Sequence, residues 1–211
     1  MYRFLIICLF AVIVISCNQQ SPSHHFKNAN AKYELKNYAG AVEDLNRAIE
    51  LDGDFKEAYY LRALSFTKLD DPDNARKDFN KAIDLDPKFA DAYLNRAFYV
   101  KMKSGEYESA IQDYNTYLTL DKEGNHAYAL NNRGFAKYKM GDYKGAIDDI
   151  DASLKINPDN AYAYRNRALI NIAFDSIEDA CRDLQISDSL GFAKDFGNEV
   201  EELINQYCNQ D

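Results

Sequence analysis

Hydrophobic and polar positions divide this chain into an apolar start, a short polar segment and a long repetitive body. Residues 4–15 form an unbroken apolar run, and residues 18–25 are polar without periodicity. From about residue 26 onwards the sequence matches itself with one clear period. An alanine marks the same place in each repeat, and successive alanines are 34, 35, 36 and 34 residues apart: Ala41, Ala75, Ala110, Ala146 and Ala180.

Residues of the same type surround each of these alanines. A small residue precedes it by twelve positions, or by thirteen in the third repeat, where an extra residue lies near Ser104; a bulky residue follows it by four. The small residues are Ala29, Ala63, Ala97, Gly134 and Ala168, and the bulky ones are Leu45, Phe79, Tyr114, Ile150 and Leu184. Small residues let two helices approach closely, and Pro87 and Pro158 end their repeats because proline removes a backbone donor. The pattern therefore predicts pairs of tightly packed helices.

This pattern resembles the tetratricopeptide repeat (TPR) family, whose unit of about 34 residues is a helix–turn–helix. The clearest copies are residues 58–87 and 128–158. The resemblance implies an all-α fold, a right-handed superhelical α-solenoid of five units over about 26–55, 56–89, 90–126, 127–160 and 161–190. The first helix of the first unit is expected to start only near Phe26. Residues 191–211 are expected to form one capping helix, centred on Lys194–Tyr207, since the last repeat of a solenoid exposes an apolar face.

The apolar run at residues 4–15 predicts an export signal. It is shorter than the roughly 20 residues that span a bilayer. It ends in Val14-Ile15-Ser16-Cys17, which looks like a bacterial lipobox. That resemblance implies a lipoprotein signal peptide over 1–16, acyl chains such as palmitate on Cys17, and a flexible tether over 17–25. The alternative is a plain secretory signal with a coincidental cysteine. Because Asn18 is not the Asp that retains some lipoproteins in the inner membrane, we expect an outer-membrane location in the bacterial cell envelope.

Two further cysteines are predicted to form a disulfide. Cys181 lies early in a second helix and Cys208 at the end of the capping helix. A turn near residue 194 would bring both to one level, and disulfides persist in exported proteins. The tail also resembles that of TPR lipoproteins of Bacteroidetes-type bacteria, in which paired cysteines recur. Two unpaired thiols are the alternative.

Charged residues recur with the repeat. Each of four arginines (Arg62, Arg96, Arg133 and Arg167) is expected to lie level with the aspartate of its own unit and of the preceding one. These aspartates are Asp44, Asp78, Asp113, Asp149 and Asp183. The arginines are either a row of anion-binding groups or, as the matching acids favour, an ion-pair ladder worth about 0–1 kcal/mol per exposed pair. The net charge of −9 and the absence of a basic cluster exclude nucleic acid as a partner.

In TPR proteins the first helices line a concave groove, so the resemblance implies a peptide-binding groove here. Its candidate residues are Tyr60, Leu64, Leu94, Asn95, Phe98, Asn131, Asn132, Phe135, Arg165, Asn166 and Leu169. Aromatic rings would cover the side chains of an extended peptide and Asn amides would bind its backbone. For Leu64, Phe98, Phe135 and Leu169, a place in the core between helices is the alternative. Apolar residues at the clamp positions argue against a chaperone-type carboxylate clamp.

The sequence contains no catalytic or cofactor motif: it has no Gly-rich phosphate loop, no H-E-x-x-H and no G-x-S-x-G. We therefore expect no enzyme activity, no cofactor and no metal. The leading hypothesis is a lipid-anchored, non-enzymatic scaffold that binds a protein or peptide in its groove at the cell envelope. A dedicated assembly factor for an outer-membrane machine, of β-barrel or pilus type, is the alternative. A solute-capture lipoprotein is a third reading.

Overall fold

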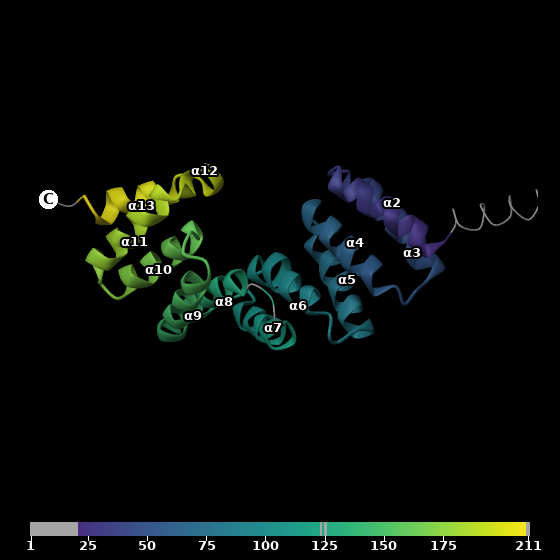
Figure 1. Ribbon diagram of the computed structural model, residues 1–211, viewed down its shortest axis with the longest axis horizontal. Coiled ribbons are helices and arrows are strands. Elements are labelled where there is room, and N and C mark those ends of the chain that lie inside the picture. Colours follow the sequence, from purple (N-terminus) through teal and green to yellow (C-terminus); the bar gives the residue numbers. More distant parts are fainter. Residues whose placement is uncertain (1–20, 123, 125, 210–211) are drawn as a thin grey trace, which may run out of the picture. The chain divides into compact units, whose positions relative to one another are not determined.

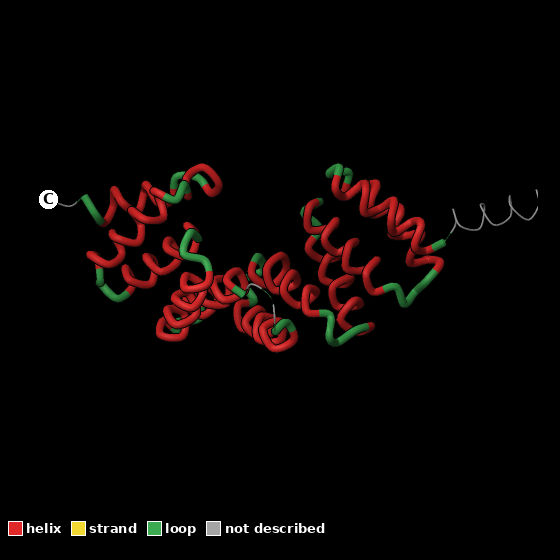
Figure 2. Tube along the Cα trace, in the orientation of Figure 1, coloured by secondary structure: helices red, strands yellow, loops and turns green. Residues whose placement is uncertain are grey.

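The structure, a computed structural model, describes residues 21–122, 124 and 126–209, and it folds this part of the chain into helices joined by short turns (Figures 1 and 2). It divides into two compact units, residues 1–100 and 101–211, which we describe separately. The predicted signal peptide and Cys17 lie outside the described residues. Among the helices that are described, none is long and apolar enough to cross a membrane.

The repeat of the sequence is a repeat of helix pairs. Each first helix begins seven residues before the small residue: α2 (Pro22–Glu34), α4 (Lys56–Lys68), α6 (Ala90–Arg96), α8 (Ala127–Lys139) and α10 (Ala161–Ala173). Each second helix begins three residues before the repeated alanine: α3 (Tyr38–Leu51), α5 (Pro72–Leu85), α7 (Tyr107–Leu120), α9 (Tyr143–Ile156) and α11 (Ile177–Ser189). All five repeated alanines are fully buried. The predicted all-α repeat architecture is thus confirmed, and close packing explains the small residues.

Gly134, the small residue of the fourth repeat, shows how tight this packing is. A Cβ at Gly134 would lie 2.8 Å from a side-chain carbon of Ile150 and 3.0 Å from the carbonyl oxygen of Ala146. Both contacts belong to α9, so α8 and α9 meet at this point. The other repeats carry alanine in the same register and bury it fully.

The first helix starts earlier than predicted. Helix α2 begins at Pro22, and the side chain of Ser21 accepts a hydrogen bond from the backbone N–H of His24 at 3.1 Å. Serine before proline is a strong helix start, because the serine side chain accepts from a free N–H group of the first turn and proline has no backbone N–H to satisfy. Residues 22–25 are therefore helical and not part of a tether. His25 takes the register position that Tyr59 has in the second repeat, which fixes the register of the first.

The turn within each pair uses a left-handed residue five positions before the alanine. Glycine occupies this place at Gly105 and Gly141, but Lys36, Asp70 and Asp175 adopt it too, with φ between 57° and 60°. Left-handed backbone costs a residue with a Cβ about 1–2 kcal/mol. A capping side chain follows in several turns: Asp71, for example, accepts from the N–H of Asn74 at 3.1 Å.

The extra residue of the third repeat lies inside a helix. The chain continues from α6 into a π-helix, η1 (Ala97–Met102), before the turn at Gly105. A π-turn accommodates one inserted residue without breaking the helix. The insertion was predicted near Ser104, so this placement is a correction of several residues.

The C-terminal cap consists of two helices rather than one. Helix α12 (Phe192–Phe196) and α13 (Glu199–Tyr207) are separated at Gly197, whose φ of 85° no continuous helix allows. Val200, Leu203 and Ile204 pack with Leu184 of α11 and with Phe192. The prediction of a single helix over Lys194–Tyr207 is therefore wrong, but α13 does cover the last repeat with apolar side chains.

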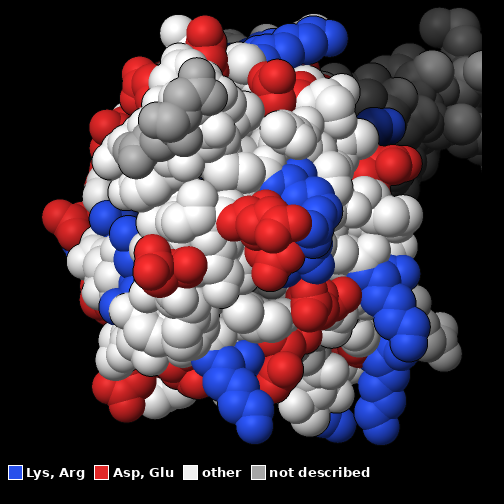
Figure 3. All heavy atoms as spheres, turned by 90° about the vertical axis from the view of Figure 1, so that its left-hand side faces the viewer, with Lys and Arg blue, Asp and Glu red and all other residues white. Residues whose placement is uncertain are grey.

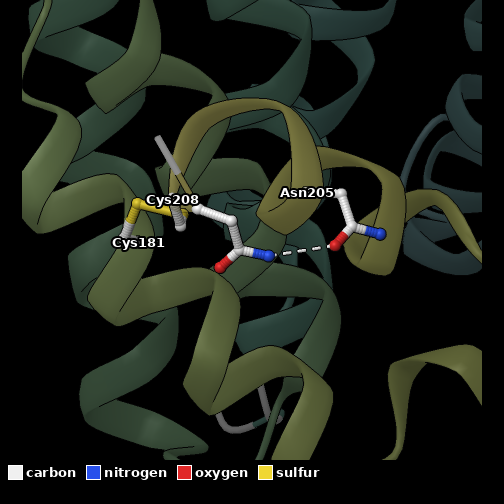
Figure 4. The surroundings of a disulfide bond; sticks show 4 residues. Cys181, Asn205 and Cys208 are labelled. Atoms are coloured by element: carbon white, nitrogen blue, oxygen red, sulfur yellow. Dashed lines mark hydrogen bonds between the residues drawn. A yellow bond between two sulfur atoms is a disulfide. The ribbon is translucent and has the colours of Figure 1, made fainter. Parts of the chain in front are cut away.

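A disulfide joins the end of the cap to α11. Cys181 and Cys208 are bonded, with their Cα atoms 5.6 Å apart, as the sequence predicted (Figure 4). Next to it, the side chain of Asn209 donates to that of Asn205 at 3.1 Å. The C-terminal end of α13 is thus fixed to the last repeat.

Candidate functional site

The repeated arginines form the predicted ion-pair ladder. Arg133 donates two hydrogen bonds to the carboxylate of Asp149, at 2.7 and 2.6 Å. Arg62 and Asp78, and Arg167 and Asp183, meet in the same two-bond geometry, at 2.6–2.8 Å. The pKa of Arg167 is raised, first because it donates hydrogen bonds to Asp183. Each of these three arginines is bound within its own repeat and is not a free anion-binding group.

The second partner of each arginine differs from the prediction. It comes from the preceding repeat, but it lies two residues after the expected aspartate: the four acceptors are Asn46, Asn80, Asn115 and Asp151, at 2.6–2.7 Å. The ladder aspartates are also more buried than expected, at 3–5 % exposed for Asp78, Asp113, Asp149 and Asp183. Asp149 also forms an ion pair with Lys137, whose Nζ lies 2.8 Å from the carboxylate. The ladder is therefore an internal polar network rather than a set of surface pairs.

Charge on the surface is mixed. At the end of the second unit shown in Figure 3, Lys and Arg side chains lie beside Asp and Glu side chains instead of gathering in one basic patch.

The groove candidates of the first unit pack on one another. Tyr60 is half-buried against Phe89, with ring centres 4.8 Å apart, and burial raises its pKa. The side chain of Asn95 donates to the hydroxyl of Tyr60 at 2.8 Å. Leu94 and Phe98 are half-buried, and Leu64 packs against the core cluster of this unit. These residues line first helices, as predicted, but Asn95 is already bonded within the protein.

In the second unit the amide candidates are internal. Asn131, Asn132 and Asn166 are 1–3 % exposed. Asn166 donates to Asn131 at 3.0 Å and accepts from Arg165 at 2.8 Å. The Asn95–Tyr60 and Asn166–Asn131 bonds each span 35 residues, so both link consecutive first helices. Most of these amide groups support the helix stack and cannot all bind a peptide backbone.

An aromatic surface surrounds Arg165. Its guanidinium lies 5.6 Å from the ring centre of Phe135 and 5.6 Å from that of Tyr162. Phe135 shares one face of α8 with Tyr128 and Asn131, because residues at i, i+3 and i+7 align on a helix. Tyr128 is 45 % exposed. We call Tyr128, Phe135, Tyr162 and Arg165 the aromatic–arginine face.

Sequence reasoning missed three parts of this face. Tyr128 and Tyr162 lie three residues before Asn131 and Arg165, so helical spacing from those candidates would have found them. Glu199 of α13 forms an ion pair with Arg165. Arg165 and Glu199 are 34 residues apart, one repeat period, so the period pointed to Glu199 even though the cap lacks the residues that mark the other repeats. Within the described residues, no three His, Cys, Asp or Glu side chains group as metal ligands.

Family models account for more than half of the chain. One tetratricopeptide repeat model matches residues 57–89 and 127–160, and a second matches residues 90–123. A TPR repeat model matches residues 29–70. The chain belongs to the tetratricopeptide repeat family. TPR proteins are in general scaffolds that bind protein or peptide partners, and the repeats of this chain are of that class.

Solved structures share the fold. YrrB, described as a TPR protein with an unusual peptide-binding site, matches with a TM-score of 0.75 at 17 % identity, over 92 % of this chain and 97 % of its own. PilW, a type IV pilus biogenesis factor, matches with 0.72 at 19 %, over 90 % and 94 %. MamA from Desulfovibrio magneticus RS-1 matches with 0.74 at 15 %, over 82 % and 97 %. No curated protein sequence matches the chain.

Proposed function

We propose that this protein is a lipid-anchored scaffold that binds an extended segment of a partner protein along the first helices of its repeats. The aromatic–arginine face carries the proposal. It combines an exposed tyrosine, half-buried rings and a guanidinium on consecutive first helices, α8 and α10. Rings of this kind cover large apolar area with little loss of side-chain freedom, which suits recognition of an extended peptide.

The alternative is a dedicated assembly factor for an outer-membrane machine. The fold match to PilW, a pilus biogenesis factor, favours this reading over solute capture. At 19 % identity the match supports the fold, and the pilus role of that protein is an analogy. Under either reading the chain acts by holding a protein partner.

The anchor is proposed from the sequence of residues 4–17 alone. Acyl chains on Cys17 would hold the repeats at a membrane through the burial of their methylene groups, and we propose the bacterial outer membrane as the location. Metabolic labelling with a palmitate analogue tests this directly. We expect label in the wild-type protein and none in Cys17→Ser, which should also leave the membrane fraction. Equal labelling of both proteins would refute the anchor.

The binding surface is tested by partner recovery from detergent-solubilised membranes. We expect Tyr128→Ala to lose recovery of the partner, because it removes the most exposed ring of the aromatic–arginine face. Phe174→Ala is the matched control, since Phe174 is 52 % exposed but lies at the turn after α10. Equal recovery by both variants would place binding elsewhere, and recovery of no protein by the wild type would count against the scaffold.

A further inference from the structure

Arg165 differs from the ladder arginines in what holds it. It is 8 % exposed and its guanidinium lies between the rings of Phe135 and Tyr162. Nη1 donates to Asn166, Nη2 meets Glu199, and Nε is buried without a hydrogen-bond partner among the described residues. A guanidinium binds a carboxylate best through two parallel N–H groups, and Arg165, unlike Arg62, Arg133 and Arg167, has no such two-bond pair.

Glu199 is the exposed half of this ion pair. Its side chain is 43 % exposed, against 10 % for Arg165. The rings and Asn166 hold the guanidinium in place, whereas the carboxylate comes from the first residue of a short helix. Because the Glu199 carboxylate keeps much of its contact with water, another carboxylate can compete with it for the arginine.

Helix α13 is held in place on both sides of its ion pair with Arg165: Val200, next to Glu199, is fully buried. The disulfide fixes α13 at Cys208, its C-terminal end. Glu199 lies at the opposite end, two residues after Gly197, whose left-handed backbone separates α12 from α13. Rotation of the Glu199 side chain, which is 43 % exposed, would withdraw its carboxylate from Arg165 while Val200 and the disulfide keep α13 in place.

We propose that Arg165 is the site at which the scaffold binds an acidic side chain within its partner segment, and that Glu199 occupies this site when no partner is bound. The inference rests on the proposed function and adds the chemistry of the partner to it. The expected ligand is an extended peptide with Asp or Glu at one position, flanked by apolar side chains that contact Tyr128, Phe135 and Tyr162. In the free protein, Glu199 competes with the acidic side chain of the peptide.

The test is selection from a random peptide library displayed on phage, with the full folded domain as bait. Wild-type protein, Glu199→Gln and Arg165→Gln are compared. Glu202→Gln, an exposed acid on the same helix, and Arg182→Gln, an exposed arginine of α11, are matched controls. Circular dichroism of each variant verifies folding.

We expect peptides with one fixed acidic position from the wild type and the two controls. Arg165→Gln should lose that acidic preference. Glu199→Gln should bind a selected peptide about two- to fivefold more tightly, because the internal competitor is gone, and should show no gain for the same peptide with Gln in place of its acid. This last comparison needs no substitution of Arg165, so it decides the matter even if Arg165→Gln does not fold.

The peptide selection distinguishes a wrong role for Arg165 from a wrong scaffold function. Selected peptides without an acidic position, or an acidic position that Arg165→Gln retains, would overturn the role of Arg165 and leave the scaffold intact. Selection of no peptide by any variant would overturn both.

Discussion

Replacing Asp149 with Asn tests whether the ladder is an internal network. Asp149 is 5 % exposed and accepts two hydrogen bonds from Arg133, while Nζ of Lys137 lies 2.8 Å away. Asn has the same shape but no charge, and its amide N–H₂ would face the donors of both cations. Removing one member of a buried pair costs about 3–5 kcal/mol. Since Arg133 and Lys137 are 18 and 20 % exposed and can turn towards water, we expect a loss of about 2–4 kcal/mol in the free energy of unfolding.

Asp151→Asn is the matched control on the same helix. Asp151 also accepts from an arginine, Arg167 at 2.6 Å, but its side chain is 52 % exposed. Its loss should stay below about 1 kcal/mol and shrink at high salt, because exposed pairs are screened. Urea unfolding followed by circular dichroism measures both variants. Equal losses, or a loss below about 1 kcal/mol for Asp149→Asn, would refute the view that the ladder is buried.

Three smaller predictions address the turns and the cap. Asp175→Gly should raise the free energy of unfolding by about 0.5–1 kcal/mol, because glycine adopts the φ of 60° found at Asp175 without strain. Gly141→Ala should lower the free energy of unfolding. A lower free energy of unfolding for Asp175→Gly would contradict the reasoning. The Cys181–Cys208 disulfide closes a separation of 27 residues, so its reduction should lower the stability of the cap by about 3–4 kcal/mol. Amide hydrogen exchange should then become faster in α13 but not in α8. Unchanged exchange in α13 would show that packing alone holds this helix. Hydrogen bonds from Asn74 lower the pKa of Asp71 below its ordinary 3.8. The stability advantage of wild type over Asp71→Asn should therefore be constant above about pH 5 and vanish as the pH falls through the lowered pKa of Asp71. Urea midpoints across pH measure this advantage, and an advantage that grows in acid would be inconsistent with this cap.

The repeat architecture was predictable because each unit demands the same residues. A buried alanine such as Ala146 and a small residue such as Gly134 are needed wherever two helices cross closely, so the pattern recurs and is visible in one sequence. The disulfide was predictable because the connection between α11 and α13 is centred near residue 194, midway between Cys181 and Cys208, even though that connection is the short helix α12 and not a simple turn. The helix start at Ser21–Pro22 also has a local signal, a capping serine followed by proline.

Other features depend on contacts that have no local pattern. The π-helix at Ala97–Met102 and the turn at Ser104 accommodate an extra residue equally well in sequence terms. The break in the cap depends on Gly197 adopting a left-handed conformation, which a helical spacing of apolar residues does not reveal. The groove amides were assigned from the family pattern, and only packing shows that Asn166 is bonded to Asn131. The ion pair between Arg165 and Glu199 does follow the repeat period, since 34 residues separate the two, but Glu199 lies in the cap, where the pattern that marks the other repeats ends.

Crosslinking in living cells tests the central claim most directly, that a protein partner lies on the first helices. A photoreactive phenylalanine analogue is placed at Tyr128 in one strain and at Phe174 in another. We expect ultraviolet light to join the protein to a specific partner from position 128 and to yield no such product from position 174. A partner captured only from position 174, or from neither position, would contradict it.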